Sequence, residues 1–194
     1  PPPTRHFYDS FEENDVRKTY LATSYQAQNG DIVDRENPSS HLELGPIPLK
    51  YGYDTNVTGN GGKSSIDPII YRLADVYLTL AEALYLKPGS SAADKEEAMT
   101  HINTIRNRAG LDGISNSEVN TEEKFVEILL KERSHELWCE NGQYRADLIR
   151  FNKFVEHAET VKGTAYANKN KELYPLPLSA INDGKGLVTQ NPGY

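Results

Sequence analysis

The central part of the chain carries apolar residues at the spacing of an amphipathic helix. From residue 69 onward they recur at intervals of three and four, at Ile69, Leu73, Val76, Tyr77, Leu80, Ala81 and Leu84. Asp67 followed by Pro68 predicts the start of this helix, because aspartate caps free N–H groups and proline suits the first helical position. Lys87-Pro88-Gly89 predicts its end.

Three further helices follow from the same spacing. The second is expected from about Ala92 to Ala109, with Gly110 as the residue that terminates it. The third begins after residue 120 or 121 and is expected to stop at residues 141–142, Asn-Gly. The fourth runs over about residues 145–159.

Short links join the first helix to the second and the third to the fourth, so the pattern predicts two antiparallel hairpins. Such hairpins stack like tetratricopeptide units, although two units alone leave apolar faces uncovered. The sequence therefore predicts an all-α fold of tetratricopeptide-like hairpins, an α/α superhelix with long irregular loops. The expected core residues are Leu73, Leu80, Ile102, Ile105 and Leu129.

The flanks of the helical region differ in character. Residues 4–25 are tyrosine-rich and predict a short helix after Asp15, whereas the segment 173–177 is extended because each proline restricts the residue before it. We therefore expect one domain over residues 1–194. It divides into a loop-rich entry segment (1–66), the helical hairpins (67–160) and an extended tail (161–194).

Composition and charge narrow the function classes. The 194 residues include 28 acidic and 21 basic side chains, a net charge of −7 that argues against nucleic acid as a partner. The single cysteine, Cys139, excludes an internal disulfide and a CxxC site, and it is expected to be a buried, inert thiol within a helix. Because residue 1 is proline and the only methionine is Met99, we expect the chain to be a piece of a longer protein.

No arrangement of residues predicts catalysis. The chain has no GxSxG or Cys–His signature, and its five histidines are scattered singly, so no catalytic residue, metal or cofactor is expected. Glu132, Glu136 and Glu140 share one helix face, whereas a glycosidase needs two carboxylates that face each other across a cleft. We expect these glutamates to pair with Arg145 or Arg150 of the next helix.

A loop rich in aromatic and amide side chains is the candidate for ligand contact. Flat aromatic rings stack on the apolar faces of sugars, and polar side chains bind the hydroxyl groups. The candidate residues are Tyr51, Tyr53, Asp54, Asn56 and Asn60. The alternative is a flexible loop with a tyrosine packed at its base. The loop also begins like a calcium-binding loop, but serine stands at its twelfth place where an EF-hand needs glutamate, so only a looser calcium site stays open.

Six blocks of residues occur in an order that is similar to one known family. They are residues 5–9 with 15–17, 50–51, 71–78 with 81–83, 102–111, 131–150, and the tail 173–177 with the terminal 190–194. In this series the chain resembles the C-terminal region of the SusD/RagB family, the surface nutrient-binding lipoproteins of Bacteroidetes-type bacteria. It departs from the family pattern at Tyr144, where arginine is usual, and between Asp183 and Val188.

The resemblance implies a non-catalytic subunit that binds a glycan or oligosaccharide and delivers it to a SusC-type TonB-dependent transporter. It also implies a place on the surface of the outer membrane, with a lipid anchor and many ligand residues on a part of the protein outside this chain. Two other function classes stay open. One is a helical-repeat adaptor that binds protein without binding sugar. The other is a glycoside hydrolase, which the lack of a facing carboxylate pair disfavours.

Overall fold

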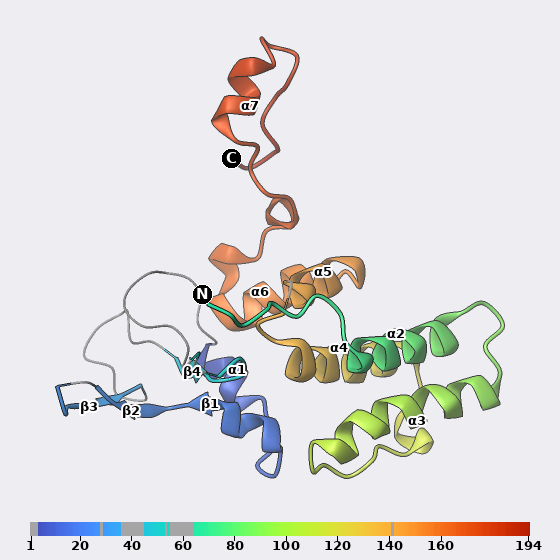
Figure 1. Ribbon diagram of the computed structural model, residues 1–194. Helices are drawn as coiled ribbons and strands as arrows, with labels where there is room; N and C mark the ends of the chain where they lie inside the picture. Colours follow the sequence, from blue (N-terminus) through green and yellow to red (C-terminus); the bar gives the residue numbers. More distant parts are fainter. Residues whose placement is uncertain (1–3, 28, 36–44, 53, 55–63, 141) are drawn as a thin grey trace. The chain divides into compact units, whose positions relative to one another are not determined.

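The computed structural model describes residues 4–27, 29–35, 45–52, 54, 64–140 and 142–194. The chain forms two compact units, residues 1–144 and 145–194. Most of the described residues that have regular structure are helical, and the strands are short, which confirms the predicted all-α fold with tetratricopeptide-like hairpins (Figure 1). None of the helices in the described part of the chain has the length and apolar character that crossing a membrane requires.

The first unit is built around one helical hairpin and a third helix. Helix α2 (Leu73–Leu86) and helix α3 (Ala92–Arg108) run antiparallel, as Figure 1 shows, and α4 (Glu122–Leu137) packs against both. Local signals set these ends as predicted. Ser91 and Asp94 form a capping box at the start of α3, Gly110 follows its end at φ +80°, and Thr121 accepts from the Lys124 N–H.

The predicted start of α2 is wrong. Asp67 and Pro68 lie in irregular chain, and the helix begins at Leu73 after Arg72, which makes no side-chain cap. Arg72 has an extended backbone (φ −150°, ψ 165°) and its guanidinium is paired with Glu136 and Glu140. These ion pairs hold the residue before the helix in the extended conformation, so the proline does not open the first turn.

Helix α2 also buries a different face from the one its spacing suggested. Its buried apolar residues are Ala74, Leu78, Ala81 and Tyr85. The alanines allow close approach of the neighbouring helices, and the Tyr85 ring stacks on the buried Phe125 ring of α4, with centroids 3.8 Å apart.

Two of the five expected core residues are therefore exposed. Leu73 is 65% and Leu80 is 40% exposed, whereas Ile102, Ile105 and Leu129 are buried as predicted. The prediction failed because α2 is apolar on nearly every side, so periodicity alone does not identify its inner face. Leu73, Leu80 and the exposed Val76 leave an uncovered apolar face on this helix, as expected for so few repeat units.

The chain after α4 departs from the predicted fourth helix. It forms α5 (Gln143–Arg150) and α6 (Phe154–Lys162), separated at Asn152, which has a left-handed φ of +55°. Helix α4 itself ends at Leu137, before the expected Asn-Gly pair. Cys139 follows that end with φ +60° and is exposed, so the expectation of a buried helical thiol was wrong.

The N-terminal segment supplies short elements around the end of α4. Helix α1 (Arg5–Asp9) precedes a 3-10 turn, η1 (Val16–Tyr20), which confirms the short helix predicted after Asp15. Strand β1 (Leu21–Ala22) pairs with β4 (Ile47–Pro48), and β2 (Ser24–Gln26) pairs with β3 (Ile32–Asp34), both antiparallel. The sequence pattern predicted none of these strands, which are only two or three residues long.

The second unit holds the tail of the chain. Residues 174–177 lie outside helices and strands, as the prolines predicted, and α7 (Leu178–Asp183) follows them unpredicted. The side chain of Gln190 brackets Leu176, accepting from its N–H at 2.7 Å and donating to its carbonyl at 3.0 Å. These contacts fix the terminal residues onto the segment before α7.

Candidate functional site

The structure describes two of the five residues predicted to contact a ligand. The Tyr51 hydroxyl donates to the Cys139 carbonyl at 3.4 Å. Among the described residues, Tyr51 lines a cavity of about 380 Å³ together with Ser64, Ile66, Pro68 and Cys139. Asp54 is described as well, whereas Tyr53, Asn56 and Asn60 lie outside the described residues. The role of this loop in ligand binding therefore stays a prediction.

The Asp54 carboxylate links the two ends of the loop. Its Oδ2 accepts hydrogen bonds from the Ser64 hydroxyl at 3.0 Å, from the Ser65 hydroxyl at 2.8 Å and from the Ser65 N–H. Among the residues that the structure describes, no three His, Cys, Asp or Glu side chains gather as metal ligands would. The serine at the twelfth place, which excluded an EF-hand, thus serves as a partner of Asp54.

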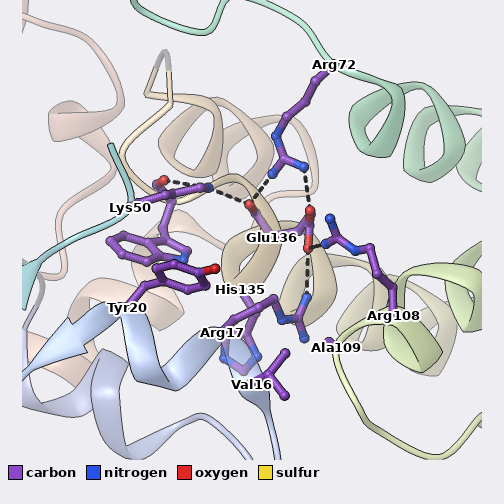
Figure 2. Close-up of a pocket in the computed structure, with 10 residues that line it drawn as sticks. Val16, Arg17, Tyr20, Lys50, Arg72, Arg108, Ala109, His135 and Glu136 are labelled. Carbon is purple, nitrogen blue, oxygen red and sulfur yellow. Dashed lines mark hydrogen bonds and ion pairs between the residues drawn. The ribbon is translucent and has the colours of Figure 1, made fainter. Parts of the chain in front are cut away.

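A second cavity, of about 310 Å³, lies beside α4 and is shown in Figure 2. Glu136 of α4 lies at its centre, with its side chain turned toward Arg17 of η1, Arg72 before α2, and Arg108 of α3. The Glu136 carboxylate accepts from Arg17 at 3.1 Å and from both other guanidinium groups. One buried carboxylate thus joins three segments that are distant in sequence.

The two other glutamates of this face have similar partners. Glu140 pairs with Arg72 at 2.9 Å and with Lys50. Glu132 pairs with Arg17 at 2.6 Å and with Arg106 of α3 at 3.5 Å. We name the three glutamates and these partners the α4 ion cluster. Its members are Arg17, Lys50, Arg72, Arg106, Arg108, Glu132, Glu136 and Glu140.

The predicted pairing of these glutamates with Arg145 or Arg150 stays a prediction, since both arginines lie in the second unit. Within that unit Arg145 donates to the Lys171 carbonyl at 2.6 Å and lies over the Tyr174 ring, and Arg150 pairs with Asp147 at 2.9 Å. Helical spacing correctly placed Glu132 and Glu136 on one face of α4, whereas Glu140 lies beyond the helix end at Leu137. Spacing carries no information on which distant segment covers that face. The tertiary fold brings cations from the N-terminal segment and from α3 to it.

Burial and charge act against each other inside the α4 ion cluster. Burial alone would raise the pKa of Glu136, but hydrogen bonds from Arg72 and the charges of Arg72 and Arg108 lower it. For Glu132 burial prevails over the attraction of Arg17, and the pKa is raised. Burial also disfavours the charged form of Lys50, which for a lysine lowers the pKa, although Glu140 opposes that shift. The surroundings therefore favour the charged form of Glu136 and disfavour the charged form of Glu132.

Lys50 ties the base of the candidate loop to the end of α4. Its Nζ donates to the carbonyl oxygens of Glu136 at 2.7 Å and Trp138 at 3.1 Å, and it lies 5.2 Å from the centre of the Trp138 ring. Since Tyr51 is the next residue, the loop leaves the scaffold from a fixed point. This role of Lys50 was not predicted from the sequence, although a lysine directly before an aromatic loop is a signal that could have suggested it.

His135 lies beside the cluster in a small aromatic core. Its ring stacks on Phe11 with centroids 3.9 Å apart, and its Nε2 lies 2.9 Å from the Ser10 hydroxyl. Burial, and then the positive charges of Arg17 and Lys131, lower the pKa of His135 to about 3. The ring is therefore neutral at neutral pH and packs as part of the core.

Comparison with protein families finds one match that extends over almost the whole chain. The model described as "SusD family" matches residues 3–194. Among curated proteins, "SusD-like protein P2" of Formosa agariphila is 26% identical over 204 residues, which is 99% of this chain. "Starch-binding protein SusD" of Bacteroides thetaiotaomicron is 31% identical over 132 residues, 64% of this chain.

Solved structures show the same fold. The "Surface glycan-binding protein A" of Bacteroides thetaiotaomicron matches 98% of the chain with a TM-score of 0.65 and 24% identity. A SusD-like protein of Bacteroides fragilis matches 100% of it with a TM-score of 0.64 and 21% identity. The chain spans 40% of the length of the Formosa relative and 21% of the length of the starch-binding relative.

Proposed function

This chain belongs to the SusD family, and on that premise we propose that it serves in binding a glycan or oligosaccharide without cleaving it. The observation that carries the proposal is the family match over residues 3–194. It is supported by two similar proteins whose names state that they bind starch or surface glycan. The candidate loop, with its tyrosines and amide side chains, has the composition that suits sugar contact.

The α4 ion cluster supports a binding role over a hydrolytic one. A glycosidase carries its two carboxylates about 5–10 Å apart on opposite sides of a scissile bond. Glu132 and Glu136 instead lie on one helix, and Glu140 lies just beyond its end. All three are buried and are each held by two or more cations. Such carboxylates stabilise the scaffold, and we assign them no role in acid–base chemistry.

On the basis of the family resemblance, we also propose a cellular location and a partner protein. The protein would lie at the outer face of the outer membrane, held by a lipid anchor on a part outside this chain. It would pass its ligand to a SusC-type TonB-dependent transporter. An adaptor that binds protein and no sugar is the second candidate, and the uncovered apolar face of α2, formed by Leu73, Val76 and Leu80, is the observation that favours it.

A double substitution in the loop tests the sugar contact. We expect Tyr53→Ala with Asn56→Ala to weaken binding of a glycan, selected on an array, about tenfold or more, since an aromatic surface and a hydrogen-bonding amide are both removed. The measurement is calorimetric titration of the whole protein. Tyr166→Ala, which removes an exposed tyrosine of the second unit, is the matched control and should leave the affinity unchanged.

Unchanged affinity in a normally folded double variant would show that the loop is only a linker. The sugar-binding residues would then lie elsewhere in the protein, while the assignment to the family would stand. Absence of binding to every glycan tested would favour the adaptor.

A further inference from the structure

The cavity beside α4 has a positively charged lining in a chain whose net charge is −7. Among the residues that the structure describes, four cationic side chains line it, Arg17, Lys50, Arg72 and Arg108, together with one carboxylate, Glu136. His135 also lines the cavity and adds no charge at neutral pH, because its pKa is lowered to about 3. Asp15, Glu132 and Glu140 pair with three of these cations from outside the lining, so the positive surplus at the cavity is small, and it does not follow from composition.

Three of these cations have their donors committed to the protein. Arg17 is shared among Asp15, Glu132 and Glu136. Arg72 donates to both carboxylates on its side of the cluster and to a backbone carbonyl. The Lys50 ammonium group has two carbonyl partners and one carboxylate partner. These three side chains hold the cavity together and have little capacity left for a ligand.

Arg108 differs from the other three cations. Its side chain is 56% exposed, and among the described residues it makes one ion pair, through Nη2, to Glu136. Its Nε–H and Nη1–H groups are therefore available at the rim of the cavity. The ion pair with Glu136 restricts the Arg108 side chain, so less side-chain entropy is lost when a further anion binds.

An aromatic surface lies across the cavity from Arg108. Tyr20 is 51% exposed, and Figure 2 shows it on one side of the cavity, with Arg108 on the other and Glu136 between them. Trp138 also lines the cavity and supports the wall beneath Lys50. A ligand ring with an apolar face and an acidic group at its edge could therefore contact Tyr20 with the face and Arg108 with the acidic group.

We propose that this cavity is a subsite for one acidic sugar residue, which carries a carboxylate or a sulfate group. The sugar ring lies against Tyr20, and the acidic group accepts hydrogen bonds from Arg108. A volume of about 310 Å³ is near the lower end for ligand pockets, roughly 300–1,000 Å³, and suits a single ring. This inference rests on the proposed glycan binding and adds the chemical class of the ligand.

The test compares acidic sugars with their neutral counterparts in calorimetric titrations of the whole protein. The probes are a galacturonate trimer against its methyl ester, a glucuronate-containing trimer against its methyl ester, and a galactan trimer with and without 6-sulfate. We expect at least one acidic probe to bind tenfold or more tightly than its neutral partner. Which one does so identifies carboxylate or sulfate as the source of the charge.

Substitutions then assign the preference to the cavity. Arg108→Gln should remove the tenfold preference, and Arg108→Lys should retain part of it, because charge remains while the planar fork is lost. Tyr20→Ala should weaken the acidic and neutral probes alike. Arg5→Gln is the matched control, since the Arg5 side chain is 52% exposed and pairs with Asp9, and its loss changes the net charge equally.

Two results would overturn the subsite and leave glycan binding intact. One is equal affinity for all acidic probes and their neutral partners in a protein that binds a neutral glycan. The other is an acidic preference that persists unchanged in folded Arg108→Gln. Absence of binding to any glycan, acidic or neutral, would overturn the subsite together with the proposed function.

Discussion

Glu136→Gln lowers the free energy of unfolding by about 3–5 kcal/mol, the cost expected when one partner of a buried ion pair is removed. The Glu136 carboxylate is buried and accepts from Arg17, Arg72 and Arg108. Glutamine keeps the size of the side chain but removes its charge, and its NH₂ group turns a donor toward guanidinium groups. Urea denaturation of the variant and of the wild-type protein measures the difference.

A control on the same helix separates the effect of losing a buried ion pair from the effect of losing one negative charge. Glu127 is 52% exposed and pairs with Lys124 at 3.2 Å, so Glu127→Gln should cost less than about 1 kcal/mol. Equal, small losses in both variants would contradict a structural role for the α4 ion cluster. Because the folded pKa of Glu136 lies below its ordinary value of 4.5, its contribution is complete above pH 4.5 and is lost as the pH falls through the folded value.

Acidification below pH 6.5 destabilises the protein through His135. Its pKa is about 3 in the folded state against 6.5 as the ordinary value, so between these limits the unfolded chain binds a proton that the folded chain does not. Stability from the neutral ring is complete above pH 6.5. It falls by about 1.4 kcal/mol for each pH unit below that value, until the folded pKa is reached.

The charges that face His135 agree with this direction. After burial, Arg17 and Lys131 disfavour the protonated ring, while Asp15 and Glu12 favour it less strongly. We expect the stability of His135→Gln, measured by urea denaturation from pH 7 to pH 4, to fall less steeply than that of the wild-type protein. His6→Gln, which replaces an exposed histidine, should keep the wild-type slope. Parallel slopes for all three proteins would refute a buried neutral His135.

Local signals in the sequence predicted where helices begin and end. The end of α3 at Gly110 and the start of α4 were predicted because such ends depend on residues within one turn. The predicted start of α2 at Asp67-Pro68 was wrong because ion pairs from Arg72 to the distant Glu136 and Glu140 outweigh this local signal. The prediction of the buried face of α2 was wrong because apolar residues lie on nearly every side of this helix. Only the packing of α3 and α4 decides which of these residues are buried.

The candidate site was likewise predicted only in part. The spacing of Glu132 and Glu136 correctly indicated a helix face held by ion pairs. The partners Arg17 and Lys50 lie more than 80 residues away in sequence, so no periodic pattern connects them with these glutamates. The cavity beside α4 forms only where these distant segments meet, so it could not be predicted from the sequence. The loop at Tyr51 was found from composition alone, and its ligand contacts remain a prediction.

Calorimetric titration of the whole protein with glycans chosen on an array, followed by chromatography of the recovered glycan, tests the proposed function most directly. Glycan binding without cleavage predicts saturable binding, with a Kd of about micromolar to millimolar, and recovery of the glycan at its original length. Failure to bind any glycan on the array, or recovery of shortened products, would contradict it.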